Sequence, residues 1–171
     1  MIRYMDIEEQ VDMDFIHARR RAFVRRVGAR LRGDPSSGAP SFEETRKFLG
    51  ARNKIRLGRR VVAVEKIVGS VGRSMDFDGA FLPVCRSLAG RWKRVDRAFH
   101  LGVDLPPVEL YKLGNRYFVL DGNHRVSVAR YQGVQWIEAE VTRFYAHTPV
   151  LGNGRAGADK RPQQALLPAV A

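Results

Sequence analysis

The strongest local signal in the chain is the stretch Tyr117-Phe118-Val119-Leu120-Asp121-Gly122-Asn123-His124-Arg125, which joins the end of a strand to the start of a helix. Aromatic and β-branched residues up to Leu120 are typical of a buried strand. The apolar spacing that follows favours a short helix that stops at Gly133. A helix that begins directly after a strand presents unpaired backbone N–H groups at the turn. The sequence therefore predicts a site for a negatively charged group here.

Each residue of this turn has a predicted role. Gly122 and Asn123 let a phosphate approach the backbone at the start of the helix, and Arg125 adds a fork of donors suited to phosphate oxygens. His124 donates a further hydrogen bond or relays a proton. Asp121 is the candidate ligand for Mg²⁺, or the group that orients His124. The alternative is that Asp121 only caps the helix and that His124 and Arg125 face solvent.

The flanking sequence predicts a small mixed sheet with helices, an α/β (α+β) fold. The expected strands are residues 61–68, 108–113, 117–120 and 136–141, and Gly114-Asn115 forms the hairpin turn between the second and third of them. A loop ending in Arg73 follows the first strand. A helix from about residue 80 or 82 to 100 precedes the hairpin, with Asp76 or Asp78 as its cap. Its basic residues, Arg91 and Arg94 among them, either form a solvated face or flank a phosphate group.

Two more helices are expected in the N-terminal third. From residue 11 to 31, Ile16, Phe23, Val27 and Leu31 recur at the helical period, which indicates an amphipathic helix. Ser41-Phe42-Glu43-Glu44 has the spacing of a capping box and begins a second helix that ends near residue 50. The basic residues between 52 and 60 are interpreted as a connector. We assign four aromatic residues to the core: Trp92, Phe99, Tyr131 and Trp136.

The charge of the chain favours anionic partners. Its 171 residues carry 30 basic and 18 acidic side chains, a net charge of +12, and residues 1–60 hold 15 of the basic and 8 of the acidic ones. The candidates for contact with a nucleic-acid backbone are Arg19, Arg20, Arg25 and Arg26. A solvated face balanced by nearby carboxylates is the alternative, and a GC-rich genome would also explain the preference for arginine.

The composition excludes several classes of protein. No apolar run is long enough for a membrane span and the N-terminus lacks a secretory signal, so we expect a cytoplasmic protein. The single cysteine, Cys85, excludes an intrachain disulfide and a cysteine-rich zinc site. The predicted organisation is a basic helical extension (1–60), an α/β domain (61–145) and a disordered tail (146–171).

Residues 61–145 resemble the ParB/sulfiredoxin superfamily. The segment 64–73 is similar to the opening strand and phosphate-facing loop of that family, which ends in an arginine. The segment 105–110 is similar to the one in which ParB proteins have Gln-Pro-Ile. The stretch 117–125 falls where ParB proteins carry Gly-Glu-Arg-Arg, the motif that grips the nucleotide triphosphate.

The resemblance implies a nucleotide-binding fold, which binds CTP in ParB proteins, ATP in sulfiredoxins and ADP in a related free-serine kinase. Gly122 and Arg125 match the shared phosphate grip, Arg73 matches the loop arginine, and His124 matches the histidine before the arginine in sulfiredoxins. Asn123 stands where sulfiredoxins have their catalytic cysteine, which excludes sulfinate repair. It also replaces the glutamate of the ParB motif, which argues against nucleotide hydrolysis and leaves binding as the expectation.

We therefore expect a regulatory module that binds a nucleotide, with Mg²⁺ at Asp121 and sequence-independent contacts from the N-terminal region to DNA. The ParB resemblance implies a homodimer. The alternative is an enzyme on the same framework, a small-molecule kinase or a metal-dependent nuclease or NTPase, with Asp121 or His124 as the general base. A third hypothesis is that no nucleotide binds at this turn and that the helices bind a protein partner.

Overall fold

The predicted hairpin is the centre of the sheet. The computed structural model describes residues 6–33, 40–72 and 75–146, and in it β3 (Val108–Leu113) pairs antiparallel with β4 (Arg116–Asp121). On the other side of β3, β5 (Trp136–Ala146) runs parallel to it, and β1 (Ala51–Ala63) pairs antiparallel with β5. The short strand β2 (Ile67–Ser70) lies parallel to β4 and completes the order β1-β5-β3-β4-β2. The mixed α/β fold class predicted from the sequence is confirmed.

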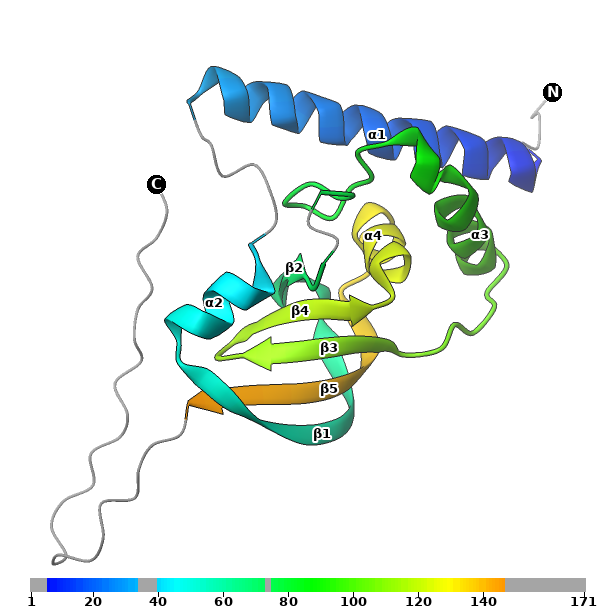
Figure 1. The fold of residues 1–171 in the computed structure, drawn as a ribbon. Coiled ribbons are helices and arrows are strands. Elements are labelled where there is room, and N and C mark those ends of the chain that lie inside the picture. The colour runs from blue at the N-terminus through cyan, green and yellow to red at the C-terminus, as the bar shows by residue number, and fades with distance from the viewer. Residues whose placement is uncertain (1–5, 34–39, 73–74, 147–171) are drawn as a thin grey trace, which may run out of the picture.

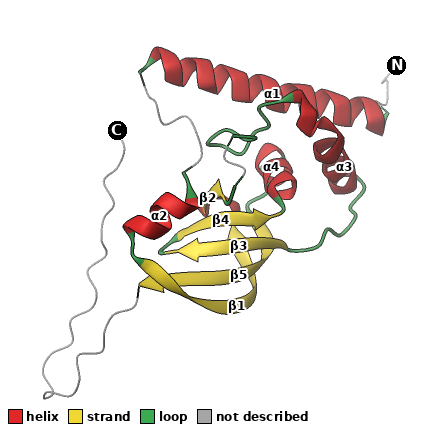
Figure 2. Cartoon of the chain, viewed as in Figure 1, coloured by secondary structure: helices red, strands yellow, loops and turns green. Residues whose placement is uncertain are grey.

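Three helices pack at one side of the sheet (Figure 1, Figure 2). The helix α4 (Asn123–Tyr131) lies between the sheet and the long helix α1 (Ile7–Leu31), and α3 (Ala89–His100) packs beside α4 and under α1, beyond the end of the strands. The short helix α2 (Phe42–Phe48) begins at Ser41, whose hydroxyl accepts from the Glu44 N–H at 3.5 Å, as the capping-box spacing predicts. It packs at the far end of the sheet, away from α3 and α4.

Three apolar clusters hold these elements together. The first lies between the sheet and α4 and includes Ile67, Val108, Val119 and Val126, all fully buried. The second joins α1, α3 and α4 around Trp92, whose indole N–H donates to the Ser127 hydroxyl at 2.9 Å. The third packs the Phe42 ring of α2 on the end of the sheet.

The prediction for residues 52–68 is wrong. Residues 52–60 are not a connector but most of β1, and the expected first strand is divided between the end of β1, one turn of 3₁₀ helix at Val64–Lys66, and β2. The basic residues fit a strand because β1 pairs only with β5 and has one solvent-exposed edge. Across the β1–β5 pairing, Arg56 and Arg59 form ion pairs with Glu140 of β5. The position between residues 60 and 61, predicted as a boundary, falls inside β1.

The helix predicted from residue 80 or 82 begins later. Residues 76–85 form a loop, followed by one 3₁₀ turn at Arg86–Leu88 and then α3. Asp78 caps no helix: its carboxylate is buried and accepts from the backbone N–H groups of Ala80 and Leu82 at 2.9 and 2.8 Å, while Phe81 adopts a φ of 61°. Asp78 therefore organises a loop.

The helix predicted over residues 11–31 is present, but its buried face is not the predicted one. Ile16, Phe23, Val27 and Leu31 are exposed to solvent. The buried apolar residues are Val11, Phe15 and three alanines, Ala18, Ala22 and Ala29. The small side chains of the alanines let α1 approach α3 and α4 closely. The core assignment holds for Trp92 and is wrong for Phe99 and Trp136, which are 41% and 60% exposed.

A polar cluster lies among α1, α3 and α4. Burial acts to raise the pKa of Asp14, but hydrogen bonds from His100, Gln10, Tyr131 and Gln132 outweigh it and lower that pKa. Burial raises the pKa of Asp96. Burial, with the hydrogen bond to Asp14, also raises the pKa of Tyr131 to about 12. The surrounding surface pairs are Asp12 with Lys93, at 2.7 Å, and Glu8 with Arg97.

Two predictions fall outside the described residues: the position of Arg73 and the disordered tail after residue 146. None of the described helices is long and apolar enough to cross a membrane.

Candidate anion-binding site

The N-terminus of α4 has the backbone geometry that the sequence predicts. Gly122 adopts φ 96° and ψ 24°, a left-handed conformation, and turns the chain from β4 into the helix. The first helical hydrogen bond runs from the Val126 N–H to the Gly122 carbonyl at 3.0 Å. The N–H groups of residues 123–125 therefore precede the intrahelical pattern and remain available at the helix end.

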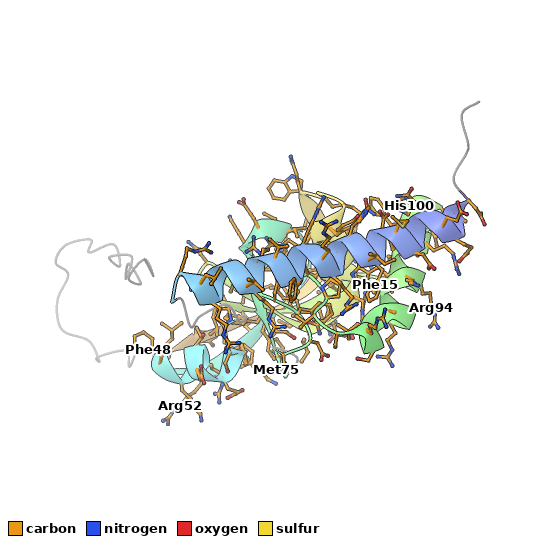
Figure 3. The ribbon with its side chains drawn as sticks, turned by 90° about the horizontal axis from the view of Figure 1, so that it is seen from above. Phe15, Phe48, Arg52, Met75, Arg94 and His100 are labelled. Carbon is orange, nitrogen blue, oxygen red and sulfur yellow. The ribbon has the colours of Figure 1, made fainter. Side chains whose placement is uncertain are left out.

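A cavity of about 250 Å³ opens at this helix end. Residues 121–125 line one side of it, and Arg91, Arg94 and Val95 of α3 line the other. A second cavity, of about 650 Å³, lies against the same residues: Arg91, Arg94 and His124 line both, and Asp76 and Ser87 line the second. Figure 3 shows Arg94 on α3, at the side of the molecule away from α1. The site thus combines a helix N-terminus with Arg91 and Arg94. The sequence alone did not decide whether these two arginines form a solvated face or flank a phosphate group.

Arg125 is held by the protein itself. One guanidinium nitrogen donates to the carbonyl oxygens of Pro106 and Pro107, the latter at 2.9 Å, and the other donates to the Asp121 carboxylate at 2.7 Å. The side chain is only 14% exposed. Its planar fork therefore joins β4 to the segment before β3, and its charge still contributes to the positive potential of the cavity.

Gly122 is tightly packed beneath Arg125. A Cβ atom at this position would lie 2.6 Å from Val108 Cγ1 and 3.0 Å from Arg125 Nε. The turn therefore requires glycine both for its φ and for the space above it.

The residues at the cavity do not fit a Mg²⁺ ion held by the protein. Asp121 is the one carboxylate among the described residues that line the 250 Å³ cavity, and it is 72% exposed and paired with Arg125. Mg²⁺ prefers several oxygen ligands in octahedral geometry. We therefore derive no step through a protein-bound Mg²⁺.

Asn123 and His124 lie between the helix end and the loop before α3. Asn123 is 6% exposed, and its side-chain oxygen has no hydrogen-bond partner within the described part of the chain. The His124 ring packs edge-on against Phe77, with 5.5 Å between ring centroids. Cys85 is not among the residues that line either cavity, and its sulfur accepts from the Ser87 hydroxyl.

The four arginines predicted to contact nucleic acid do not share one face of α1. Arg19 and Arg26, seven residues apart, lie on one side of the helix because a residue advances it by about 100°. Arg25 lies near the loop, with its Nε 3.4 Å from the buried Asp78 carboxylate. Arg20 lies on the solvent side, between the exposed Ile16 and Phe23.

A larger groove lies on the other side of Arg125. Its volume is about 680 Å³, and its lining includes Phe99, Leu105, Pro106, Val134 and the exposed Trp136. No local sequence pattern indicates this groove, because its walls come from β1, α3, α4, β5 and the segment before β3. Its lining is predominantly apolar, and the two arginines that also line it, Arg59 and Arg125, are accompanied by the carboxylates of Asp104 and Glu138. The charged residues of this groove therefore balance, unlike those of the cavity at the α4 terminus.

Comparisons with known proteins add little to this geometry. No protein-family model matches the chain, and no curated protein matches it. Among solved structures it is similar to sulfiredoxin from Arabidopsis thaliana, with a TM-score of 0.35 and 14% identity over 53% of this chain and 84% of that one. A similarity of this extent supports no conclusion about activity, and the fold class rests on the strands and helices described above.

Proposed function

We propose that this protein binds the phosphate groups of a nucleotide at the N-terminus of α4. The observation that carries the proposal is the cavity in which residues 122–125 face Arg91 and Arg94 of α3. A phosphate placed there would accept from unpaired backbone N–H groups and gain from the positive end of the helix dipole. The two guanidinium groups would add charge-assisted hydrogen bonds from the opposite wall.

The neighbouring cavity offers room for the rest of the ligand. Arg91, Arg94 and His124 line it together with Ser87 and Asp76, so a ligand with phosphates at α4 would extend along the start of α3. CTP, ATP and ADP are the candidates that follow from the family resemblance. In this proposal any Mg²⁺ arrives on the nucleotide, and Arg125 acts as a positioning residue that holds the turn.

We infer binding rather than turnover as the role of the site. Asn123 is buried and neutral at the position where a catalytic group would be needed, and Asp121 is paired with Arg125. The general-base role predicted for Asp121 would require that ion pair to open. The kinase and nuclease alternatives therefore depend on His124, which lines both cavities.

Calorimetry with a nucleotide panel tests the proposal. Wild-type protein is titrated with CTP, ATP, ADP and GTP in the presence of Mg²⁺, and then Arg91→Ala and Arg94→Ala are titrated with the nucleotide that binds. Each of these substitutions should lower the affinity for the nucleotide about ten- to hundredfold, because charge-assisted hydrogen bonds contribute about 1.5–3 kcal/mol. Arg116→Ala is the control, because Arg116 is exposed at the far end of β4.

Two outcomes would contradict this assignment. If no nucleotide gives a heat of binding, the nucleotide proposal is wrong, and the hypothesis that the helices bind a protein partner is favoured. Equal affinities for Arg91→Ala, Arg94→Ala and Arg116→Ala would place the nucleotide elsewhere on the molecule. Formation of product from any nucleotide during the same titrations would favour the enzymatic alternative.

A further inference from the structure

Two carboxylates and an imidazole meet where α1, α3 and α4 join, and none of the three lines the proposed nucleotide site. Asp14 of α1 is 5% exposed, Asp96 of α3 is fully buried, and the His100 side chain at the end of α3 is 26% exposed. Figure 3 shows His100 beside the N-terminal half of α1. We call these three residues the helix-junction cluster.

The three residues of the cluster lie close enough together to ligate one metal ion. His100 Nε2 lies 2.9 Å from Asp14 Oδ2 and 3.6 Å from Asp96 Oδ2, and one ligand atom of each residue lies within 4.8 Å of the other two. Bonds of about 2.0–2.2 Å to a tetrahedral ion separate its ligand atoms by roughly 3.3–3.5 Å. Small side-chain movements would bring all three atoms to that spacing.

The buried carboxylate of Asp96 is incompletely satisfied. Its Oδ1 accepts from Gln132 Nε2 at 2.8 Å, but its Oδ2 is buried without a hydrogen-bond partner among the described residues and faces His100. A buried carboxylate oxygen with no donor is costly, and a cation bound there would remove the cost. This oxygen is the observation that distinguishes the cluster from an ordinary group of acidic residues.

Neighbouring side chains already hold the carboxylates in place. Tyr131 and Gln10 each donate to Asp14 Oδ1 at 3.0 Å, and Gln132 bridges the two carboxylates by donating to Asp14 Oδ2 at 3.3 Å as well. Such outer partners fix the orientation of metal ligands. The partly exposed His100 leaves a path from solvent to the cluster.

We propose that Asp14, Asp96 and His100 bind a divalent transition-metal ion, with Zn²⁺ as the best-fitting candidate. The imidazole favours Zn²⁺ over Mg²⁺ and Ca²⁺, which prefer all-oxygen sites, and water would complete the coordination. Because the ligands come from α1 and α3, the ion would fasten the N-terminal helix to the body of the fold. Binding to the folded state would then raise its stability with metal concentration.

The test uses the full chain after removal of metals with a chelator. Equilibrium dialysis against Zn²⁺ followed by metal analysis should give one ion per chain, and Zn²⁺ should raise the melting temperature while Mg²⁺ leaves it unchanged. Asp96→Asn keeps the size of the side chain and removes its charge, so it should weaken Zn²⁺ binding at least tenfold. His100→Gln should do the same.

Another histidine provides the control. His17→Gln should retain wild-type affinity, since His17 is exposed on α1 outside the cluster. Absence of Zn²⁺ binding by the folded wild type would overturn the proposal and leave the cluster as a hydrogen-bonded junction. Binding that His100→Gln does not weaken, with its fold verified by circular dichroism, would overturn it as well.

Discussion

Gly122 determines whether the proposed site can form. Gly122→Ala would place a methyl group 2.6 Å from Val108 Cγ1 at a φ of 96°. The strained dihedral alone costs about 1–3 kcal/mol, and the overlap with a fully buried valine adds to it. We expect a loss in the free energy of unfolding of at least about 2 kcal/mol, measured by urea denaturation.

Gly133→Ala separates the two causes of that loss. Gly133 also has a positive φ, 73°, but a Cβ there would meet nothing within 4 Å. It should therefore show the dihedral cost alone. If both substitutions lower stability equally, the close packing at Gly122 is not energetically important.

Arg125 illustrates a residue whose type the sequence identifies but whose partners it does not. The motif predicts a phosphate contact, because arginine after a glycine turn is typical of such sites. The Pro106 and Pro107 carbonyls that accept its hydrogen bonds are 19 and 18 residues earlier in the chain, and no local pattern joins them to Arg125. Arg91 and Arg94 face the same cavity only because α3 packs against α4, which the sequence does not specify.

Arg125→Ala should consequently lower stability as well as any affinity for nucleotide. The substitution leaves three acceptors without their donor at a largely buried position, so we expect a loss of about 1.5–3 kcal/mol in the free energy of unfolding. Arg116→Ala, at an exposed site, should stay within about 0.5 kcal/mol of wild type. If Arg125→Ala and Arg116→Ala have the same free energy of unfolding, the hydrogen bonds of Arg125 contribute nothing to stability.

Among the elements, those with local signals were predicted well. The β3–β4 hairpin, α2 and α4 each have their turn, cap or stop within a few residues, so the sequence shows them directly. The strand β1 has no such signal, because its partner β5 lies about 80 residues later and its exposed side is basic. Asp78 resembles a helix cap locally, and only the packing of the loop reveals its role.

Helix α1 is the clearest case in which periodicity predicts an element but not its orientation. Apolar residues occur on two opposite sides of this helix. The larger ones, such as Phe23, face solvent, and the side with Phe15 and the alanines is buried. Close packing over small residues, rather than the largest apolar surface, has determined which side contacts α3.

Two phenylalanines of α1 test which side of the helix is buried. Phe15→Ala should cost about 3–5 kcal/mol in unfolding free energy, because Phe15 is 5% exposed and its ring packs on Trp92 with 5.5 Å between centroids. Phe23→Ala, at a site 68% exposed, should change stability by less than about 0.5 kcal/mol. The reverse order would mean that the opposite face is buried. Sedimentation of the wild type tests the homodimer implied by the family resemblance.

At the scale of the whole molecule, the chain has a net charge of +12, and the charged residues of α1 are distributed unevenly along the helix. The acidic residues near the start of α1 pair with α3, through Asp12 with Lys93 and Glu8 with Arg97. The second half of α1 carries several arginines, of which Arg25 forms an ion pair with Asp78. The charges of the long helix are therefore balanced at its N-terminal end and basic at its C-terminal end. The net charge summed over residues 1–60 does not reveal this difference.

This distribution leads to a specific expectation for DNA. If the basic end of α1 contacts the phosphate backbone, affinity for duplex DNA should be independent of sequence, and log affinity should fall with log salt by about 0.9 per phosphate contact. Arg19→Ala and Arg26→Ala, on one side of the helix, should together reduce that slope by about 1.8. Arg25→Ala should change it much less, because Arg25 lies against Asp78. Fluorescence anisotropy over a series of salt concentrations measures all three slopes. Binding that does not depend on salt would exclude α1 as the contact with the phosphate backbone. An equal effect of Arg25→Ala would mean that Arg25 also contacts DNA, although it lies beside Asp78.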